Sequence, residues 1–112
     1  MQSLHTMTLL SLMLSASCNL FQSNEVSLIN RSNVILTDLR FSYANSVFER
    51  SALHPSERLT LAPDATNDGA ILVTYKIDEK IIEHHLGYAV AIPMTCEYKI
   101  ETHQMSGGCE ER

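Results

Sequence analysis

The sequence contains no tryptophan, no cluster of basic residues and no apolar run long enough to span a bilayer, and each absence excludes a class of protein. The 112-residue chain carries eight Lys and Arg against 13 Asp and Glu, a formal net charge of −5. Its basic residues are scattered from Arg31 to Arg112. A nucleic-acid-binding domain needs a basic face that neutralises phosphates. We therefore expect no nucleic-acid partner.

Motifs that place catalytic groups are also absent. The sequence contains neither the G-x-S-x-G turn of serine hydrolases nor a phosphate-binding glycine loop. The acidic residues that could pair for hydrolysis, Asp64, Asp68, Asp78 and Glu79, fall in predicted turns, where solvated carboxylates are ordinary. A small domain with short loops has little room for a pocket that excludes water. We expect neither catalytic residues nor a cofactor, so the protein is predicted not to be an enzyme.

Metal-ligating residue types are present but poorly arranged. His84 and His85 are adjacent, so on a strand they point to opposite faces and cannot share one ion. The soft and borderline ligands of the tail are Cys96, His103, Met105 and Cys109. These types suit Cu(I) or Zn, but an oxidised cysteine pair would remove two of the four. We expect no metal site, and a periplasmic copper carrier is kept as an alternative function.

Residues 1–17 have the organisation of an export leader. The densest apolar run, Met7–Leu14, falls within the roughly 7–15 residues of a signal-peptide core and well below the ~20 of a membrane-spanning helix. Small residues follow at 15–17, as a signal peptidase requires. The first seven residues, MQSLHTM, lack the Lys or Arg that such leaders normally carry. We expect residues 1–17 to be a signal peptide that is removed.

The stretch Leu14-Ser15-Ala16-Ser17-Cys18 resembles the lipobox of bacterial lipoproteins, with Ser15 where a Leu is commonest. The resemblance implies cleavage before Cys18, lipidation of its sulfur, and a domain that faces the periplasm. Asn19 in place of Asp implies delivery to the outer membrane. The ordinary signal peptidase would cut the same bond and leave a soluble secreted or periplasmic protein. Residues 18–25 are then the lipidated cysteine and a polar tether.

Cysteine parity supports the anchored form. The chain contains three cysteines, Cys18, Cys96 and Cys109, and exported proteins tend to pair their cysteines. If Cys18 is lipidated, the other two form a disulfide, whereas an unmodified Cys18 leaves one thiol over. A bridge between Cys96 and Cys109 closes a loop that would contribute about 3 kcal/mol in the chain-entropy model.

Residues 26–112 form one predicted β domain. They contain no uninterrupted apolar repeat of helical period, and apolar and polar residues alternate in short runs, most clearly over Val34–Tyr43, Ile71–Ile77 and Met94–Thr102. Turn signals separate the runs, the strongest being Pro63–Gly69. Six or seven such strands are typical of an all-β sandwich. An immunoglobulin-like antiparallel arrangement is expected as architecture only, because without tryptophan the antibody pattern Cys…Trp…Cys is missing.

Three local patterns give sharper predictions. The inward faces of two strands are predicted to comprise Ile35, Leu39, Phe41 and Tyr43 in one, and Ile82, Leu86, Tyr88, Val90 and Ile92 in the other. Gly87 indicates a bulge or a close backbone approach in the second strand. Asn30-Arg31-Ser32 matches the N-glycosylation sequon, but a turn is the favoured interpretation.

These features predict a cell-envelope lipoprotein that binds another envelope protein without catalysis, as a structural or accessory component of an envelope or secretion assembly. The predicted contacts are the exposed loops His54–Glu57 and Pro63–Gly69 and the acidic turn Asp78–Glu79, together with any open sheet edge. An immunity or inhibitor protein against a periplasmic toxin or hydrolase is an alternative, because an acidic binder is steered toward a basic target. The residues identify neither the partner nor the oligomeric state.

Overall fold

The computed structural model describes residues 23–112. The predicted leader, Cys18 and the first part of the predicted tether lie outside the described residues. Within residues 23–112 there is no helix long and apolar enough to cross a membrane.

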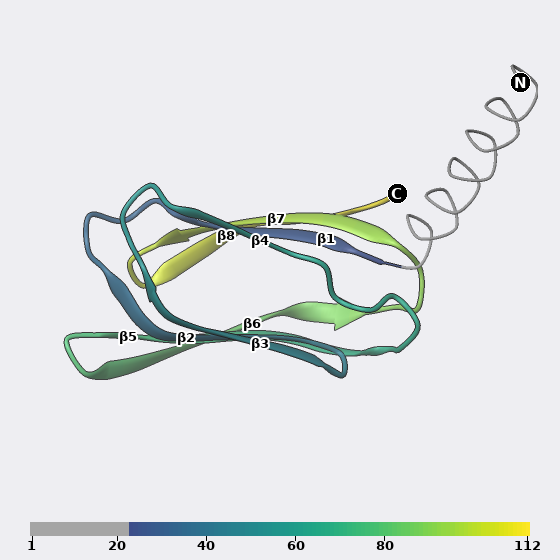
Figure 1. Ribbon diagram of the computed structural model, residues 1–112, viewed down its shortest axis with the longest axis horizontal. Helices are drawn as coiled ribbons and strands as arrows, with labels where there is room; N and C mark the ends of the chain where they lie inside the picture. Colours follow the sequence, from purple (N-terminus) through teal and green to yellow (C-terminus); the bar gives the residue numbers. More distant parts are fainter. Residues whose placement is uncertain (1–22) are drawn as a thin grey trace, which may run out of the picture.

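Eight strands form two four-stranded sheets that pack face to face (Figure 1). The strands are β1 (Glu25–Asn30), β2 (Leu36–Tyr43), β3 (Ser46–Leu53), β4 (Arg58–Leu61), β5 (Gly69–Ile77), β6 (Lys80–Ala89), β7 (Met94–Glu101) and β8 (Gln104–Glu111). The sheet orders are β4-β1-β7-β8 and β3-β2-β5-β6. Neighbours are antiparallel except β1 and β7, which are parallel. The predicted all-β sandwich is confirmed, with eight strands where six or seven were expected.

The strand order is not that of the immunoglobulin fold. There the first two strands pair within one sheet. Here β1 lies between β4 and β7, and β2 belongs to the opposite sheet. The expected likeness therefore holds for the two-sheet architecture and not for the strand order. Placing β1 at the centre of its sheet buries even its outward-facing residues Ser27 and Ile29.

The core consists of the apolar residues that alternate along the strands. Its largest fully buried side chains are Tyr43, Tyr75, Phe41, Leu28, Leu36, Leu39, Leu53, Ile100, Val26 and Val73. The alternation predicted over Ile71–Ile77 and Met94–Thr102 is confirmed, since the buried residues are Ile71, Val73 and Tyr75 in β5 and Cys96, Tyr98 and Ile100 in β7. Period-two alternation sufficed there because neither strand carries an extra residue within its alternating run.

A bulge in β2 corrects the first predicted inward face. The register with β5 shifts between Thr37 and Arg40, and Asp38 has a φ of 48°. Leu36 and Leu39 are therefore both buried, whereas Ile35 is exposed. The prediction that Ile35 faces the core is wrong, because an inserted residue moves everything before it to the other face.

A second bulge corrects the prediction for β6. The register with β5 shifts beside Gly87, whose φ is 144°, so the predicted bulge is confirmed. Beyond it Ala89 is buried and Tyr88 is 70% exposed. The prediction that Tyr88, Val90 and Ile92 face the core is wrong for the same reason.

The glycine-rich tail forms the edge strand β8, joined to β7 by the predicted disulfide. Cys96 and Cys109 lie opposite each other in the ladder and are bonded. Gly107 has a φ of 125°, and a Cβ there would collide with the carbonyl oxygen of Glu97. Glycine is thus required at position 107, where β8 lies close beside β7.

Candidate functional site

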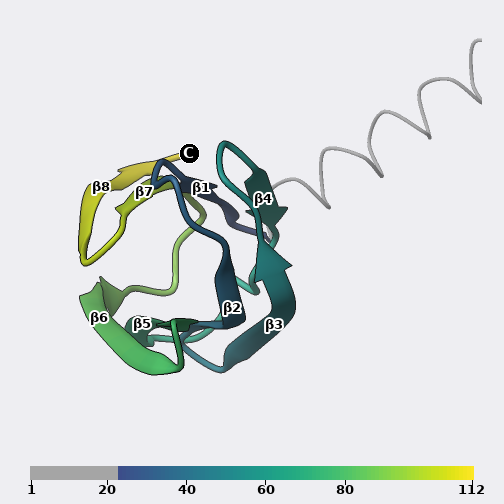
Figure 2. The same ribbon diagram turned by 90° about the vertical axis from the view of Figure 1, so that its left-hand side faces the viewer.

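The two ends of the sandwich collect different segments (Figures 1 and 2). We call the end at which the described chain begins and ends the near end, and the opposite end the far end. The near end contains Ser23, Arg112 and the turns β2–β3, β4–β5 and β6–β7. The far end contains the turns β1–β2, β3–β4, β5–β6 and β7–β8, and Figure 2 looks onto it. Of the predicted contact segments, His54–Glu57 and Asp78–Glu79 lie at the far end, and Pro63–Gly69 lies at the near end. The structure therefore gathers two of the three and separates the third.

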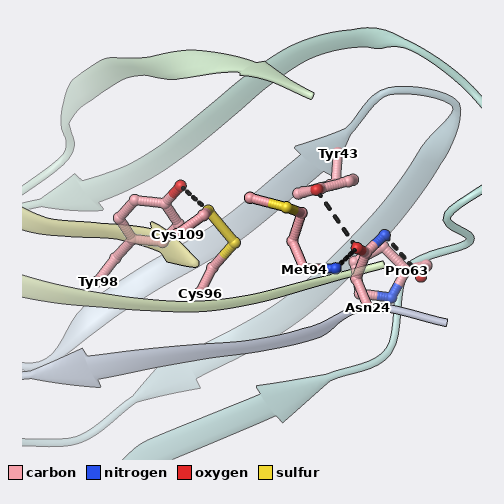
Figure 3. Close-up of a disulfide and its surroundings, with 7 residues drawn as sticks. All are labelled: Asn24, Tyr43, Pro63, Met94, Cys96, Tyr98 and Cys109. Atoms are coloured by element: carbon pink, nitrogen blue, oxygen red, sulfur yellow. Dashed lines mark hydrogen bonds between the residues drawn. A yellow bond between two sulfur atoms is a disulfide. The ribbon is translucent and has the colours of Figure 1, made fainter. Parts of the chain in front are cut away.

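At the near end, the buried side chain of Asn24 forms hydrogen bonds to three neighbouring segments (Figure 3). Its side chain is 1% exposed, and its amide nitrogen donates to the carbonyl of Pro63 at 3.3 Å. Its Oδ1 accepts from the backbone N–H of Met94 at 2.6 Å and from the hydroxyl of Tyr43 at 3.5 Å. These bonds join β1 to β7 and to β2 of the opposite sheet. Asn24 falls within the predicted tether, yet it belongs to the folded domain and fixes the position of Ser23.

Asn30 closes the far end, from the other end of the same strand. It is fully buried, and its amide nitrogen donates to the carbonyls of Val34 at 2.8 Å and Leu53 at 2.9 Å. Its Oδ1 accepts from the backbone N–H and the hydroxyl of Ser32, at 3.0 and 2.6 Å. Both amide protons are thus in use inside the protein. The turn interpretation of Asn30-Arg31-Ser32 is confirmed, and the sequon offers no accessible glycosylation site.

A tyrosine and a histidine form a second polar contact at the far end. The hydroxyl of Tyr75 donates to the carbonyl of Thr102 at 2.6 Å and lies 2.9 Å from Nε2 of His84. Because the hydroxyl has one proton, His84 Nε2–H must be the donor in the second bond. Burial raises the pKa of Tyr75 to about 12. Burial lowers the pKa of His84, and the charge of His103 lowers it further. The pair itself lies within one sheet, and the bond from Tyr75 to Thr102 joins that sheet to the β7–β8 turn of the other.

Three residues of the predicted metal alternative are engaged in other contacts, His84 with Tyr75 and Cys96 with Cys109. His84 faces inward and His85 is exposed, as their adjacency predicts. Cys96 and Cys109 are oxidised, and Tyr98 donates its hydroxyl proton to the Cys109 sulfur at 3.1 Å. No three His, Cys, Asp or Glu residues between 23 and 112 could hold a metal ion together. The tail set therefore loses two of its four ligands.

The hollows on the surface of residues 23–112 are open to solvent. One of about 430 Å³ lies over β2 and β3, and another of about 500 Å³ lies over the outer face of β7 and β8. Neither is lined by the Tyr75–His84 pair. Glycines at 107 and 108 contribute to the second hollow because they add no side chains.

Within residues 23–112, four of the six exposed large apolar side chains lie on β6 and the connection that follows it, and the other two are Ile35 and Val47. Ile81 is 67% exposed near the start of β6 and Tyr88 is 70% exposed near its end. Val90 and Ile92, in the connection to β7, are 46% and 38% exposed. Sequence reasoning missed this surface because it assigned Tyr88, Val90 and Ile92 to the core. The signal that could have found it was Gly87, since a bulge there reverses the alternation.

Comparisons with known proteins describe the fold and not the function. No protein-family model matches the chain, and no curated protein matches it. A solved structure described as the NMR structure of the protein from Eubacterium rectale is similar to it, with a TM-score of 0.54 and 9% sequence identity. The similarity covers 80% of this chain and 88% of the solved chain. At this identity the likeness shows a shared fold alone.

Proposed function

We propose that the protein is a lipid-anchored module of the cell envelope that binds another protein through the open edge of β6 and catalyses no reaction. The observation that carries the proposal is the exposure of Ile81 on a long edge strand. An edge strand presents backbone N–H and C=O groups that can pair with a strand of a partner. Side chains beside such an edge then select the partner.

The four sheet edges differ in how well they are protected. Strand β4 is only four residues long, and short edges pair poorly. Strand β3 exposes Val47 at 48% but also carries the charged residues Glu49 and Arg50, and β8 ends in Glu110 and Glu111. Strand β6 is ten residues long and exposes Ile81 at 67%, more than any apolar side chain of the other three edge strands, although Lys80 and Glu83 lie beside it. It is thus the edge on which a partner strand would bury apolar surface while it forms backbone hydrogen bonds.

The anchor is supported by the sequence and is compatible with this arrangement. The lipobox-like stretch ends at Cys18, and Ser23 lies at the near end. A domain held at its near end would present its far end, with Ile81 and the turn Asp78–Glu79, away from the membrane. The net charge of −5 would steer this surface toward a basic partner.

Site-specific photo-cross-linking in the native envelope tests the binding surface. A photoreactive amino acid at Ile81 should give one discrete adduct, and the same amino acid at Glu49, on the opposite edge of the sheet, should give none. Reversing the charge two positions away with Glu83→Lys should weaken the adduct if the partner is basic. Equal yields from 81 and 49, or no adduct from 81, would contradict the proposal. A partner that is a soluble hydrolase or toxin would identify the inhibitor alternative.

Intact mass of the protein purified from membranes tests the anchor. The expected mass begins at Cys18 and includes acyl chains. A mass that includes residues 1–17, or one that begins at Cys18 without acyl chains, would contradict the lipoprotein.

A further inference from the structure

We infer that the apolar side chains of Tyr88, Val90 and Ile92 form a lipid-contacting patch that rests on the head-group region of the membrane carrying the protein. This inference rests on the proposed lipid anchor at Cys18 and adds an orientation to it. The occupant of the patch is a neutral, zwitterionic lipid surface. The patch is named the near patch below.

The near patch lies beside the point where the described chain begins. Pro93, next to Ile92, accepts a hydrogen bond from the backbone N–H of Arg112 at 3.0 Å. The guanidinium of Arg112 in turn donates to the carbonyl of Ser23 at 3.2 Å. Asn24 binds the backbone N–H of Met94 at 2.6 Å. The connection β6–β7 and the start of β1 are therefore held together by hydrogen bonds.

The chain length between anchor and domain keeps this end close to the membrane. Only residues 19–22 separate Cys18 from Ser23. At about 3.3–3.6 Å per residue, even a fully extended chain would place Ser23 no more than about 18 Å from Cys18. A tether this short gives the near patch a high effective concentration at the lipid surface. The far end, where β6 begins and which therefore includes Ile81, lies at the opposite side of the domain (Figure 1).

The chemistry of the near patch suits a lipid interface. Tyrosine is enriched at membrane–water boundaries because its ring is apolar and its hydroxyl stays hydrated. Val90 and Ile92, two and four residues further along the chain, add exposed apolar surface. The acidic residues Glu110 and Glu111 at the end of β8, and the net charge of −5, would be repelled by anionic lipids. Contact is therefore apolar, which is the reason for assigning a neutral lipid surface.

The bulge at Gly87 explains why these side chains are outside. Without the extra residue, Tyr88 would face the core, as strict alternation requires. Scattered exposed apolar residues are ordinary, but three within five residues at the end that carries the tether are concentrated.

A tryptophan reporter tests the inference, because the chain has none of its own. The full-length lipidated protein is placed in phosphatidylcholine–phosphatidylethanolamine vesicles whose acyl chains carry bromine, which quenches tryptophan. Tyr88→Trp is the reporter, and Ile81→Trp, at an equally exposed position of the same strand, is the matched control. We expect Trp fluorescence at 88 to shift to the blue and to be quenched at least about twofold more than at 81, as for interfacial aromatic residues. Adding Val90→Ser and Ile92→Ser to Tyr88→Trp should reduce the quenching.

Two kinds of failure are distinguishable. Acylated protein that binds the vesicles with equal quenching at 88 and 81, or with stronger quenching at 81, would overturn the near patch and leave the anchor intact. Protein without acyl chains by intact mass, which does not sediment with the vesicles, would overturn the anchor and the orientation that depends on it. Unchanged urea midpoints for both reporters exclude misfolding as the cause.

Discussion

The two ends of the sandwich are each closed by one buried asparagine, and the two residues do so in opposite ways. Both flank β1, the central strand of its sheet, with Asn24 just before it and Asn30 at its end. Asn30 donates two short bonds to backbone carbonyls. Asn24 donates one long bond from its amide and accepts two through its oxygen.

A side-chain amide can both donate and accept hydrogen bonds, and the two ends depend on these two functions to different degrees. At the far end the donors matter most, because the Leu53 carbonyl would lose its side-chain donor and the Val34 carbonyl would keep only the 3.2 Å contact to the Ser32 hydroxyl. At the near end the acceptor is essential, because it fixes the N–H of Met94 and the hydroxyl of Tyr43. An aspartate keeps the acceptors and loses the donors. The same substitution at the two ends should therefore have unequal effects.

The largest effect is expected from Asn30→Asp. The variant removes the amide donor from the carbonyls of Val34 and Leu53, at about 1–3 kcal/mol each, leaves Val34 with only the 3.2 Å contact to the Ser32 hydroxyl, and places a carboxylate against both in a buried site. We expect the free energy of unfolding to fall by about 4 kcal/mol, measured by urea denaturation at neutral pH with an unchanged m value.

Asn24→Asp is the matched control for this prediction. It also buries a carboxylate, but that carboxylate faces one carbonyl instead of two and still accepts from the N–H of Met94 and the hydroxyl of Tyr43, so we expect a smaller loss of about 1–2 kcal/mol. Equal losses for the two variants, or a larger loss for Asn24→Asp, would show that the ends do not differ as described.

The second effect concerns the disulfide that ties β8 to the sheet. Cys96→Ala combined with Cys109→Ala should lower the free energy of unfolding by about 3 kcal/mol, because the open chain regains loop entropy. Wild-type protein measured in reductant should show the same loss. A loss below about 1 kcal/mol would mean that the β7–β8 hydrogen bonds hold the tail without the bridge.

Sequence reasoning predicted the parts of this fold that depend on local alternation. It predicted the inward faces of β5 and β7, the pairing of Cys96 with Cys109, and the bulge at Gly87. It did not follow the consequence of the bulge for Tyr88, because alternation was continued through it.

Features that depend on strand order could not be predicted. Whether β6 is an edge is decided by which strands pair across the sheet, and no local pattern contains that information. The burial of Asn24 likewise depends on Pro63 and Met94, which are distant in sequence. The strand character of the tail arises because Gly107 allows β8 to approach β7 closely.

The smallest effect is expected from acid pH, and it belongs to the far end. The pKa of His84 is lower in the folded protein, because of burial and then the charge of His103, so the unfolded chain binds the proton more readily. The contribution of neutral His84 to the free energy of unfolding is fully present above the pKa of the unfolded chain, about 6.5, and is lost as the pH falls below that value. The bond to Tyr75 survives protonation, since Nε2–H is a donor in both forms, and this keeps the loss small. His84→Gln retains a donor and does not titrate, so its urea midpoint should change less than that of the wild type between pH 7.5 and 5.5. Parallel curves for the two proteins would assign the acid sensitivity to the exposed histidines instead.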